Sequence, residues 1–316
     1  MSRGPLGAGW YPEPMTRLEH APRFGSVLTA MVTPFDERGE LDLDAAAVLA
    51  RWLAGHGSEG LVVAGSTGEG TVLSDDEKLS LWRAVAEAVT IPVIAATGSN
   101  DTRHSIELTA QAAGLGAAGV LVVTPYYSRP SQRGLFEHFR AVAGATELPV
   151  VLYDIPIRSG RRIGTDIMVR LVHEVANIVA VKDSGRDPET SARLLNLVPS
   201  TFELYCGDDS LTLPLLSIGG VGVVSVASHW IGRELHAVVS AFLKGDVDGA
   251  CAGNRRLIES FDFESTEEYP NPMPAKAACR VQGLAVGHCR APHGTAPPEL
   301  EGEARRVLVR AGVPVG

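Results

Sequence analysis

The sequence predicts a (β/α)8 barrel of the TIM-barrel class, followed by a C-terminal three-helix extension. Two observations carry this prediction: eight short apolar, β-branched runs recur along the chain, and a helical pattern separates each run from the next. Continuous apolar runs are typical of parallel strands that are covered on both faces. A doubly wound open sheet is the alternative, but no G-x-G-x-x-G follows the first run, so its usual nucleotide-binding fingerprint is missing.

The eight runs are the expected strands, in chain order. They are SVLTAMVTPF (26–35), GLVVAGS (60–66), PVIAATG (92–98), GVLVVTP (119–125), PVVLYDIP (149–156), NIVAVKDS (177–184), FELYCGD (202–208) and VGVVSVAS (221–228). Helix ends are recognisable between them. Ser74 and Glu77 form an S-x-x-E capping box, and Gly114 and Gly116 are a usual helix stop.

The domain organisation follows from where the strand pattern begins and ends. Residues 1–24 contain Gly and Pro but no apolar signal core, so we expect a flexible N-terminal extension. The barrel is expected over 25–245. Beyond it, VDGACAGNRRLIESF, NPMPAKAACRVQGL and PPELEGEARRVLVRAG predict three helices within 246–316. The sequence leaves open whether these helices pack on the barrel or on a partner subunit.

Composition excludes several classes of protein. The 316 residues are 45% hydrophobic and 21% charged, as in ordinary soluble globular proteins. A net charge of −9 argues against a nucleic-acid partner, because sequence-independent binders need a basic surface. No apolar run reaches the roughly 18 residues that a membrane helix needs. The four cysteines form no C-x-x-C pair, which favours a reduced, cytoplasmic protein.

Polar residues gather at the carboxyl ends of the expected strands, where barrels of this class carry their active sites. The amino ends carry mostly Gly, Pro and Asn. We therefore expect the chemistry at one mouth of the barrel, among GSTGEG (65–70), Tyr126-Tyr127, Tyr153-Asp154, Arg158, Lys182-Asp183 and Gly207-Asp208-Asp209.

Lys182 ends an apolar run, and two interpretations are open for it. The strand can stop there and the lysine reach water, or the amine can be desolvated and attack a carbonyl. Tyr153 is expected on the neighbouring strand, either packed in the core or acting as an acid/base group. The concentration of polar residues at this mouth favours the chemical interpretation for both.

The remaining candidates point to carboxylate binding. Backbone N–H groups in GSTGEG can approach an anion, and Ser66 and Thr67 add hydroxyl donors, although such a loop can also be a structural turn. Arg158 suits a carboxylate but can also be solvated. No histidine has metal-ligand spacing with a strand-end carboxylate, Asp208-Asp209 suits a helix N-cap, and a Ser-His-Asp hydrolase lacks its G-x-S-x-G.

Five motifs in order resemble the dihydrodipicolinate synthase (4-hydroxy-tetrahydrodipicolinate synthase) family. They are GSTGE (65–69), VTPYYSRPSQRGLFEHF (123–139), LYDIPIRSG (152–160), VAVKDSG (179–185) and CGDDSLTLPLLSIGGVGVVSV (206–226). This family belongs to the pyruvate-dependent class I aldolases, with N-acetylneuraminate lyase. The resemblance covers about residues 25–290.

The resemblance implies a role for each candidate residue. Lys182 forms a Schiff base with pyruvate, and Tyr153 shuttles protons. Ser66 and Tyr127 complete a hydroxyl relay with Tyr153, and Tyr127 reaches in from a neighbouring subunit. The remaining assignments are substrate contacts: Thr67 and Gly68 hold the pyruvate carboxylate, Arg158 receives the carboxylate of aspartate semialdehyde, and Gly207 and Val224 line the pyruvate pocket.

The resemblance further implies a homotetramer that uses no metal and no organic cofactor. The expected activity is condensation of pyruvate with L-aspartate 4-semialdehyde, in lysine and diaminopimelate biosynthesis. The alternative is a related aldolase or dehydratase acting on N-acetylneuraminate or 2-keto-3-deoxy sugar acids. A non-enzymatic keto-acid-binding barrel is less favoured, because a sensor has no need of a proton relay.

Two departures from the family pattern matter. Synthases usually carry Thr-Thr where this chain has Ser66-Thr67, as the neuraminate lyases do, and serine lacks the methyl group that restricts the rotamer. Lysine-inhibited members carry two histidines and a glutamate where this chain has Asp75, Lys78 and His104. Lys78 would repel a lysine ligand, so we expect weak or absent inhibition by lysine.

Overall fold

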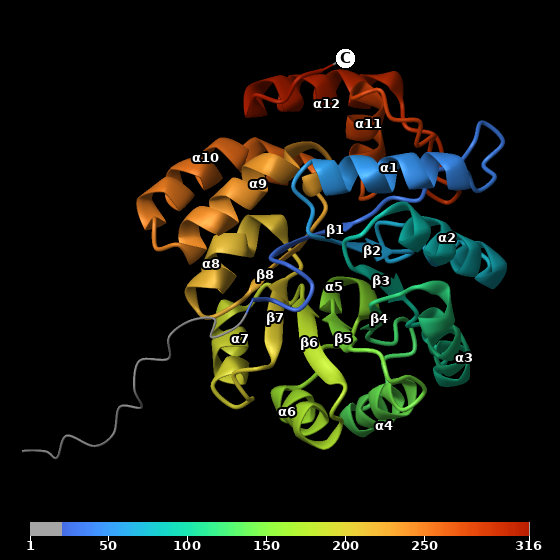
Figure 1. Cartoon of the computed structure of the whole chain (residues 1–316), viewed down its shortest axis with the longest axis vertical. Helices are drawn as coiled ribbons and strands as arrows, with labels where there is room; N and C mark the ends of the chain where they lie inside the picture. Colours follow the sequence, from blue (N-terminus) through green and yellow to red (C-terminus); the bar gives the residue numbers. More distant parts are fainter. Residues whose placement is uncertain (1–20, 316) are drawn as a thin grey trace, which may run out of the picture.

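The computed structural model describes residues 21–315, and its eight strands form one closed parallel barrel in chain order (Figure 1). Strand β1 closes the barrel against β8, with Leu28 opposite Val224. The predicted (β/α)8 fold is confirmed. Each strand is shorter than its apolar run, because the runs continue into the loops. The strands are β1 (Val27–Ala30), β2 (Gly60–Val63), β3 (Val93–Ala96), β4 (Gly119–Val123), β5 (Val150–Asp154), β6 (Ile178–Asp183), β7 (Glu203–Cys206) and β8 (Gly222–Ser225).

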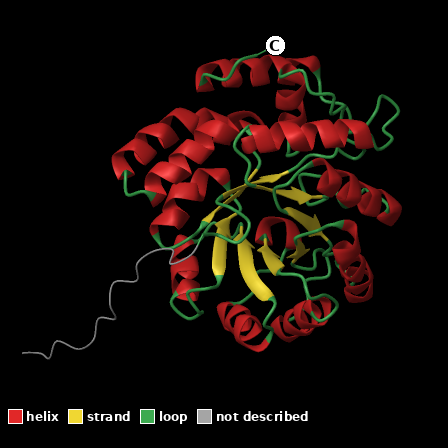
Figure 2. Cartoon of the chain, viewed as in Figure 1, coloured by secondary structure: helices red, strands yellow, loops and turns green. Residues whose placement is uncertain are grey.

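Helices surround the strands as an outer layer (Figure 2). The capping box predicted at Ser74 and Glu77 is present at the start of α2, and Gly116 ends the turn after α3 with φ 85°. The barrel helices are α1 (Leu43–Gly55), α2 (Asp75–Ala88), α3 (Thr102–Ala112), α4 (Gln132–Ala143), α6 (Thr165–Glu174), α7 (Pro188–Leu195), α8 (Thr212–Ser217) and α9 (Ser228–Leu243), with a short α5 (Pro156–Ser159) and two 3-10 turns, η1 (Ala113–Leu115) and η2 (Asp209–Leu211).

The strands bury both faces, which explains why their runs are apolar without alternation. Side chains on one face, including Leu28, Ile94 and Val224, form a cluster inside the barrel. Side chains on the other face, such as Val63 and Leu204, pack under the helices in a second, larger cluster. Tyr153 belongs to the inner cluster, so alternation along β5 turns Asp154 to the outside.

The C-terminal extension packs on the barrel, which the sequence left open. It contains α10 (Val247–Phe263), α11 (Met273–Val281) and α12 (Pro298–Ala311), and all three contact α9. In Figure 1 these helices lie along one side of the barrel, next to α9 and α1. Leu257 and Leu308 belong to the same hydrophobic cluster as the barrel helices, so barrel and extension share one core.

The described part of the chain already contacts the barrel at Arg23 and Phe24. Residues 1–20, where most of the expected N-terminal extension falls, lie outside the described residues. Phe24 is only 2% exposed and belongs to the inner cluster, while the Arg23 backbone N–H donates to Glu203 Oε1 at 2.7 Å. Within residues 21–315, no helix combines the length and apolarity needed to cross a membrane.

Candidate active site

Lys182 and Tyr153 lie side by side at the carboxyl ends of β6 and β5. The two residues are register partners, and Lys182 Nζ lies 4.4 Å from the centroid of the Tyr153 ring. Lys182 is 5% exposed and Tyr153 is 4% exposed. The interpretation in which Lys182 reaches water is therefore wrong. The amine is therefore buried beside Tyr153, where a lysine can act as a nucleophile toward a carbonyl group.

Gly207 leaves the space that the Lys182 side chain occupies. A Cβ atom built on Gly207 would lie 3.1 Å from both Cγ and Cε of Lys182, and 2.1 Å from Ser184 Oγ. The Gly207 N–H donates to Asp183 O at 2.8 Å, which holds this backbone close to β6. Val224 is buried in the inner cluster together with Tyr153. Gly207 therefore borders the lysine directly, and Val224 lies in the barrel interior.

The GSTGEG segment (65–70) forms a tight loop after β2. Glu69 has a left-handed backbone with φ 56°, and a Cβ atom on Gly68 would lie 2.9 Å from Met31 O. The Thr33 hydroxyl donates to Gly68 O at 2.6 Å. The loop is therefore held in one conformation from several sides. Such a compact, glycine-rich turn can present backbone N–H groups to an anion.

Thr67 and Ser66 differ in their surroundings. Thr67 is buried, and its Oγ1 accepts a hydrogen bond of 3.0 Å from Asn271 Nδ2 in the C-terminal extension. Ser66 is half-buried and lines a cavity. The hydroxyl of Ser66 is thus open to a ligand, while Thr67 is held by the protein itself.

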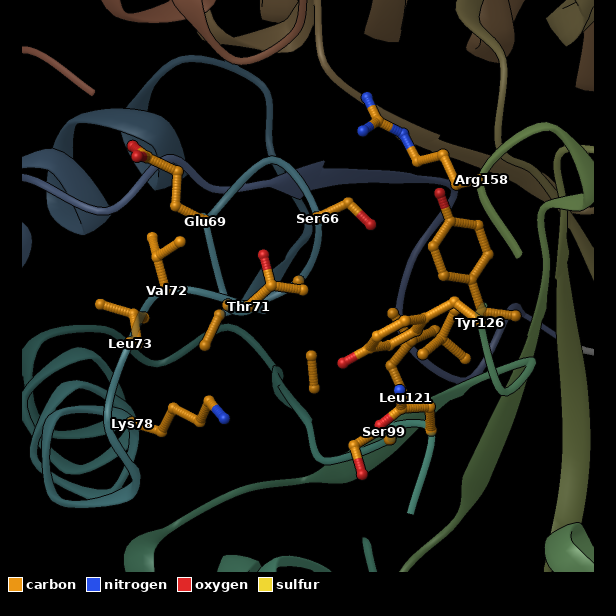
Figure 3. Close-up of a pocket in the computed structure, with 18 of the residues that line it drawn as sticks. Ser66, Glu69, Thr71, Val72, Leu73, Lys78, Ser99, Leu121, Tyr126 and Arg158 are labelled. Atoms are coloured by element: carbon orange, nitrogen blue, oxygen red, sulfur yellow. The ribbon is translucent and has the colours of Figure 1, made fainter. Parts of the chain in front are cut away.

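A cavity of about 440 Å³ lies at the carboxyl ends of the strands. Ser66, Tyr126 and Arg158 line one part of it, and Lys78 borders another part (Figure 3). Tyr153 also lines the cavity. Burial raises the pKa of the Tyr126 hydroxyl. In Figure 3, Tyr126 and Arg158 lie on the side of the cavity opposite Lys78. The cavity therefore connects the Tyr153 region with the α2 region.

The predicted relay is incomplete within one chain. Tyr127 is 92% exposed, adopts a left-handed backbone with φ 68°, and does not line this cavity. Ser66 and Tyr153 do share the cavity. The role expected for Tyr127 requires a neighbouring subunit and stays a prediction.

Two carboxyl groups lie behind the reacting face. Asp154 and Asp183 are register partners, each one residue after Tyr153 and Lys182. Burial raises the pKa of Asp154 to about 7, and the Asp183 charge adds to this shift, although the Ile163 N–H donates to Asp154 Oδ1 at 3.0 Å. A carboxyl group with a raised pKa therefore lies on the outer side of the barrel, where Arg162 Nε, 3.4 Å from Asp154 Oδ2, opposes the shift.

The Asp208-Asp209 pair has a structural role. Asp208 caps η2, with its side chain accepting from Ser210 N, as the sequence predicted. Asp209 is buried and accepts from the backbone N–H groups of Val226 at 2.8 Å and Ala227 at 3.3 Å. Among residues 21–315, no three or more His, Cys, Asp and Glu side chains gather in a way that could hold a metal ion.

The sequence analysis missed what the C-terminal extension brings to the site. Pro292 and His293 line the cavity, Asn271 binds Thr67, and Lys276 pairs with Glu69. These residues follow the last strand, so a search of strand ends could not find them. One signal was available: Lys276 is a lone lysine among the apolar residues of MPAKAACRV.

Comparisons with known proteins agree with this geometry. The model of the dihydrodipicolinate synthetase family matches residues 23–311. A 4-hydroxy-tetrahydrodipicolinate synthase of Acidothermus cellulolyticus is 51% identical over 300 residues, covering 94% of this chain and 95% of the relative. One from Moorella thermoacetica is 46% identical over 293 residues, covering 92% and 99%.

Solved structures show the same likeness. Dihydrodipicolinate synthase from Cyanidioschyzon merolae with lysine bound has a TM-score of 0.89 and 42% identity, covering 92% of this chain and 99% of that one. The enzyme from Bacillus anthracis has a TM-score of 0.87 and 41% identity, covering 90% and 98%. The fold, the positions of Lys182 and Tyr153, and these matches lead to one conclusion: this chain belongs to the dihydrodipicolinate synthetase family.

Proposed function

We propose that this chain is a lyase that condenses pyruvate with L-aspartate 4-semialdehyde to give 4-hydroxy-tetrahydrodipicolinate. The observation that carries the proposal is the buried Lys182 amine 4.4 Å from the Tyr153 ring. Relatives that are 46% and 51% identical over most of the chain bear the name of this synthase. The reaction belongs to lysine and diaminopimelate biosynthesis.

The proposed chemistry begins with attack of the Lys182 amine on the keto carbon of pyruvate. Water leaves and an imine forms, whose protonated form withdraws electrons from the pyruvate methyl group. Loss of a methyl proton gives an enamine, and its carbon attacks the aldehyde, whose oxygen takes up a proton. The amino group of the semialdehyde then displaces Lys182 from the imine, which closes the ring and frees the enzyme. Tyr153, next to the amine, is the acid/base group that moves protons during these steps. No cofactor is required for this sequence.

We assign substrate binding to charges and donors at the same mouth of the barrel as the lysine. The GSTGEG loop would hold the pyruvate carboxylate through Thr67 and the Gly68 backbone. Arg158 borders the cavity and presents a guanidinium that suits the carboxylate of the aldehyde. Gly207 and Val224 shape the space next to the imine.

We further propose that a neighbouring subunit completes the relay with its copy of Tyr127, in a cytoplasmic homotetramer. Tyr127 is 92% exposed in the loop after β4, and Ile157 is 86% exposed in α5, which follows the neighbouring strand β5. Exposed large apolar side chains that gather in this way suit a subunit contact. Within one subunit, Ser66 and Tyr153 would form the rest of the relay.

Borohydride trapping tests the reaction class. Pyruvate and borohydride added to the folded protein should give a reduced adduct on Lys182, found by mass spectrometry of peptides. The Lys182→Arg variant should give none, because a guanidinium does not form an imine under these conditions. A folded wild-type protein without an adduct would show that the Schiff-base proposal is wrong.

The aldehyde partner needs a second measurement, because Ser66 is shared with neuraminate lyases and favours the alternative substrates. We expect kcat/KM for aspartate semialdehyde to exceed that for N-acetylneuraminate and 2-keto-3-deoxy sugar acids. Arg158→Ala should lower kcat/KM for the semialdehyde about tenfold to a hundredfold, the scale of a charge-assisted contact. A preference for a sugar acid, unaffected by Arg158→Ala, would establish the alternative.

A further inference from the structure

The C-terminal extension holds both carboxylate oxygens of Glu69 in the GSTGEG loop. Lys276 Nζ lies 2.7 Å from Glu69 Oε1, and the Arg290 backbone N–H donates to Oε2 at 2.8 Å. The side chains of Lys276 and Glu69 are 1% and 2% exposed. This is a buried ion pair between α11 and a loop that lies about 200 residues earlier in the chain.

The position of Lys276 is fixed by more than its charge partner. Nζ also donates to His288 O at 2.8 Å and lies 4.1 Å from the centroid of the Phe35 ring. Burial lowers the pKa of Lys276, while the Glu69 charge acts in the opposite direction. An ion pair buried this deeply contributes little net stability compared with apolar residues of similar size. Its effect is to define where the loop lies.

The loop needs such support because its backbone is strained. Glu69 is not glycine, yet it has φ 56°, and left-handed backbone at a residue of this kind costs free energy that the surroundings must offset. Arg290 holds the chain just after the loop, because its guanidinium donates to Val72 O at 3.2 Å and to both carboxylate oxygens of Glu77 in α2.

A second contact from the extension acts on Thr67 directly. Asn271 Nδ2 donates to Thr67 Oγ1 at 3.0 Å, and both side chains are buried. An amide nitrogen can only donate, so the Thr67 oxygen is the acceptor and its own proton is free to be donated elsewhere. Asn271 thereby orients the hydroxyl that is expected to bind the pyruvate carboxylate.

We propose that Asn271 and Lys276 of the C-terminal extension are positioning residues for the carboxylate-binding loop, and that they set the affinity for a small 2-keto acid. Asn271 orients the Thr67 hydroxyl, and Lys276 fixes the backbone at Glu69. This inference rests on the proposed function, because it assigns the loop to the substrate carboxylate.

The test is borohydride trapping on Lys182 over a range of pyruvate concentrations, with calorimetric titration of pyruvate in parallel. Asn271→Ala should raise the half-saturating pyruvate concentration about fivefold, the scale of one hydrogen bond, with the maximal adduct yield retained. In a Thr67→Val background, Asn271→Ala should have no further effect. Lys276→Met should shift half-saturation in the same direction and also lower the melting temperature.

Glu301→Gln is the matched control. Glu301 pairs with Arg280 at 2.6 Å inside the extension, so its loss perturbs the extension without touching the loop. We expect half-saturation in this variant to equal the wild-type value. A merely structural role of the extension would instead lower the melting temperature of all these variants and leave half-saturation unchanged.

Two results would overturn the inference: an unchanged half-saturation in Asn271→Ala, or a full fivefold shift that persists in the Thr67→Val background. If Lys276→Met does not fold, the Asn271 comparison decides alone. A folded wild-type protein that gives no adduct would refute the Schiff-base function. In that case the dissociation constants for pyruvate from calorimetry still decide whether Asn271 positions the loop.

Discussion

Replacing Gly207 with alanine should disturb Lys182 through a single added carbon. The new Cβ atom would lie 2.1 Å from Ser184 Oγ and 3.1 Å from the Cγ and Cε atoms of Lys182. The first contact is impossible, so Ser184 must rotate. The second is tight, so the lysine stem must shift by a few tenths of an ångström.

The cost can be worked out from these contacts. Rotating Ser184 removes its 2.9 Å hydrogen bond to Gly207 O, which costs about 1 kcal/mol. Displacing the Lys182 side chain within its packed surroundings destabilises the fold by about 1–3 kcal/mol. The free energy of unfolding should therefore fall by about 2–4 kcal/mol, which corresponds to a melting temperature lower by about 3–6 °C. The displaced amine should form the imine about tenfold more slowly.

Two measurements check this prediction: the rate of borohydride trapping with pyruvate, and the melting temperature from circular dichroism. Gly302→Ala is the matched control, because nothing lies within 4 Å of a Cβ atom at that position of α12. This control should trap pyruvate at the wild-type rate. It should also melt slightly higher, because alanine favours a helix over glycine by about 1 kcal/mol.

A Gly207→Ala protein with wild-type trapping rate and melting temperature would refute the reasoning. The double variant Gly207→Ala, Ser184→Gly separates the two contacts, because it removes the 2.1 Å overlap and keeps the 3.1 Å one. We expect it to recover neither the melting temperature nor the trapping rate, because the hydrogen bond to Gly207 O stays lost and the contact with Lys182 remains. Recovery of both would mean that Ser184, rather than Lys182, transmits the effect.

Two further predictions concern pH and lysine. Burial raises the pKa of Asp154 to about 7, so the folded protein keeps a proton that the unfolded chain loses above about pH 4. The free energy of unfolding should therefore fall as pH rises from about 4 to 7. Asp154→Asn should flatten this fall and gain up to about 4 kcal/mol above pH 7. Equal free energies of unfolding from urea titrations at pH 5 and pH 8 would contradict this prediction. Lysine should inhibit weakly or not at all, because Lys78 lines the cavity and the Asp75 carboxylate already pairs with Lys78 at 3.5 Å and His104 at 2.9 Å. Potent inhibition in a steady-state assay would refute this second prediction.

Much of the barrel and of its reacting centre could be predicted from the sequence. Apolar runs and helical patterns each extend over short windows of sequence, so the eight strands and their helices can be predicted from those windows. Consecutive strands of a barrel are neighbours, so residues at the ends of two successive runs, such as Tyr153 and Lys182, must lie side by side. The capping box at Ser74 was likewise readable, because a cap involves residues only three positions apart.

Only the tertiary structure decided how the rest of the site is built. It showed that the C-terminal extension packs on α9, and that Asn271 binds Thr67 across a sequence separation of 204 residues. It also showed the left-handed backbone at Glu69 and the outward position of Tyr127. The physical reason is range: periodicity and caps report on neighbours along the chain, whereas these features depend on irregular segments whose path is set by the packing of distant elements.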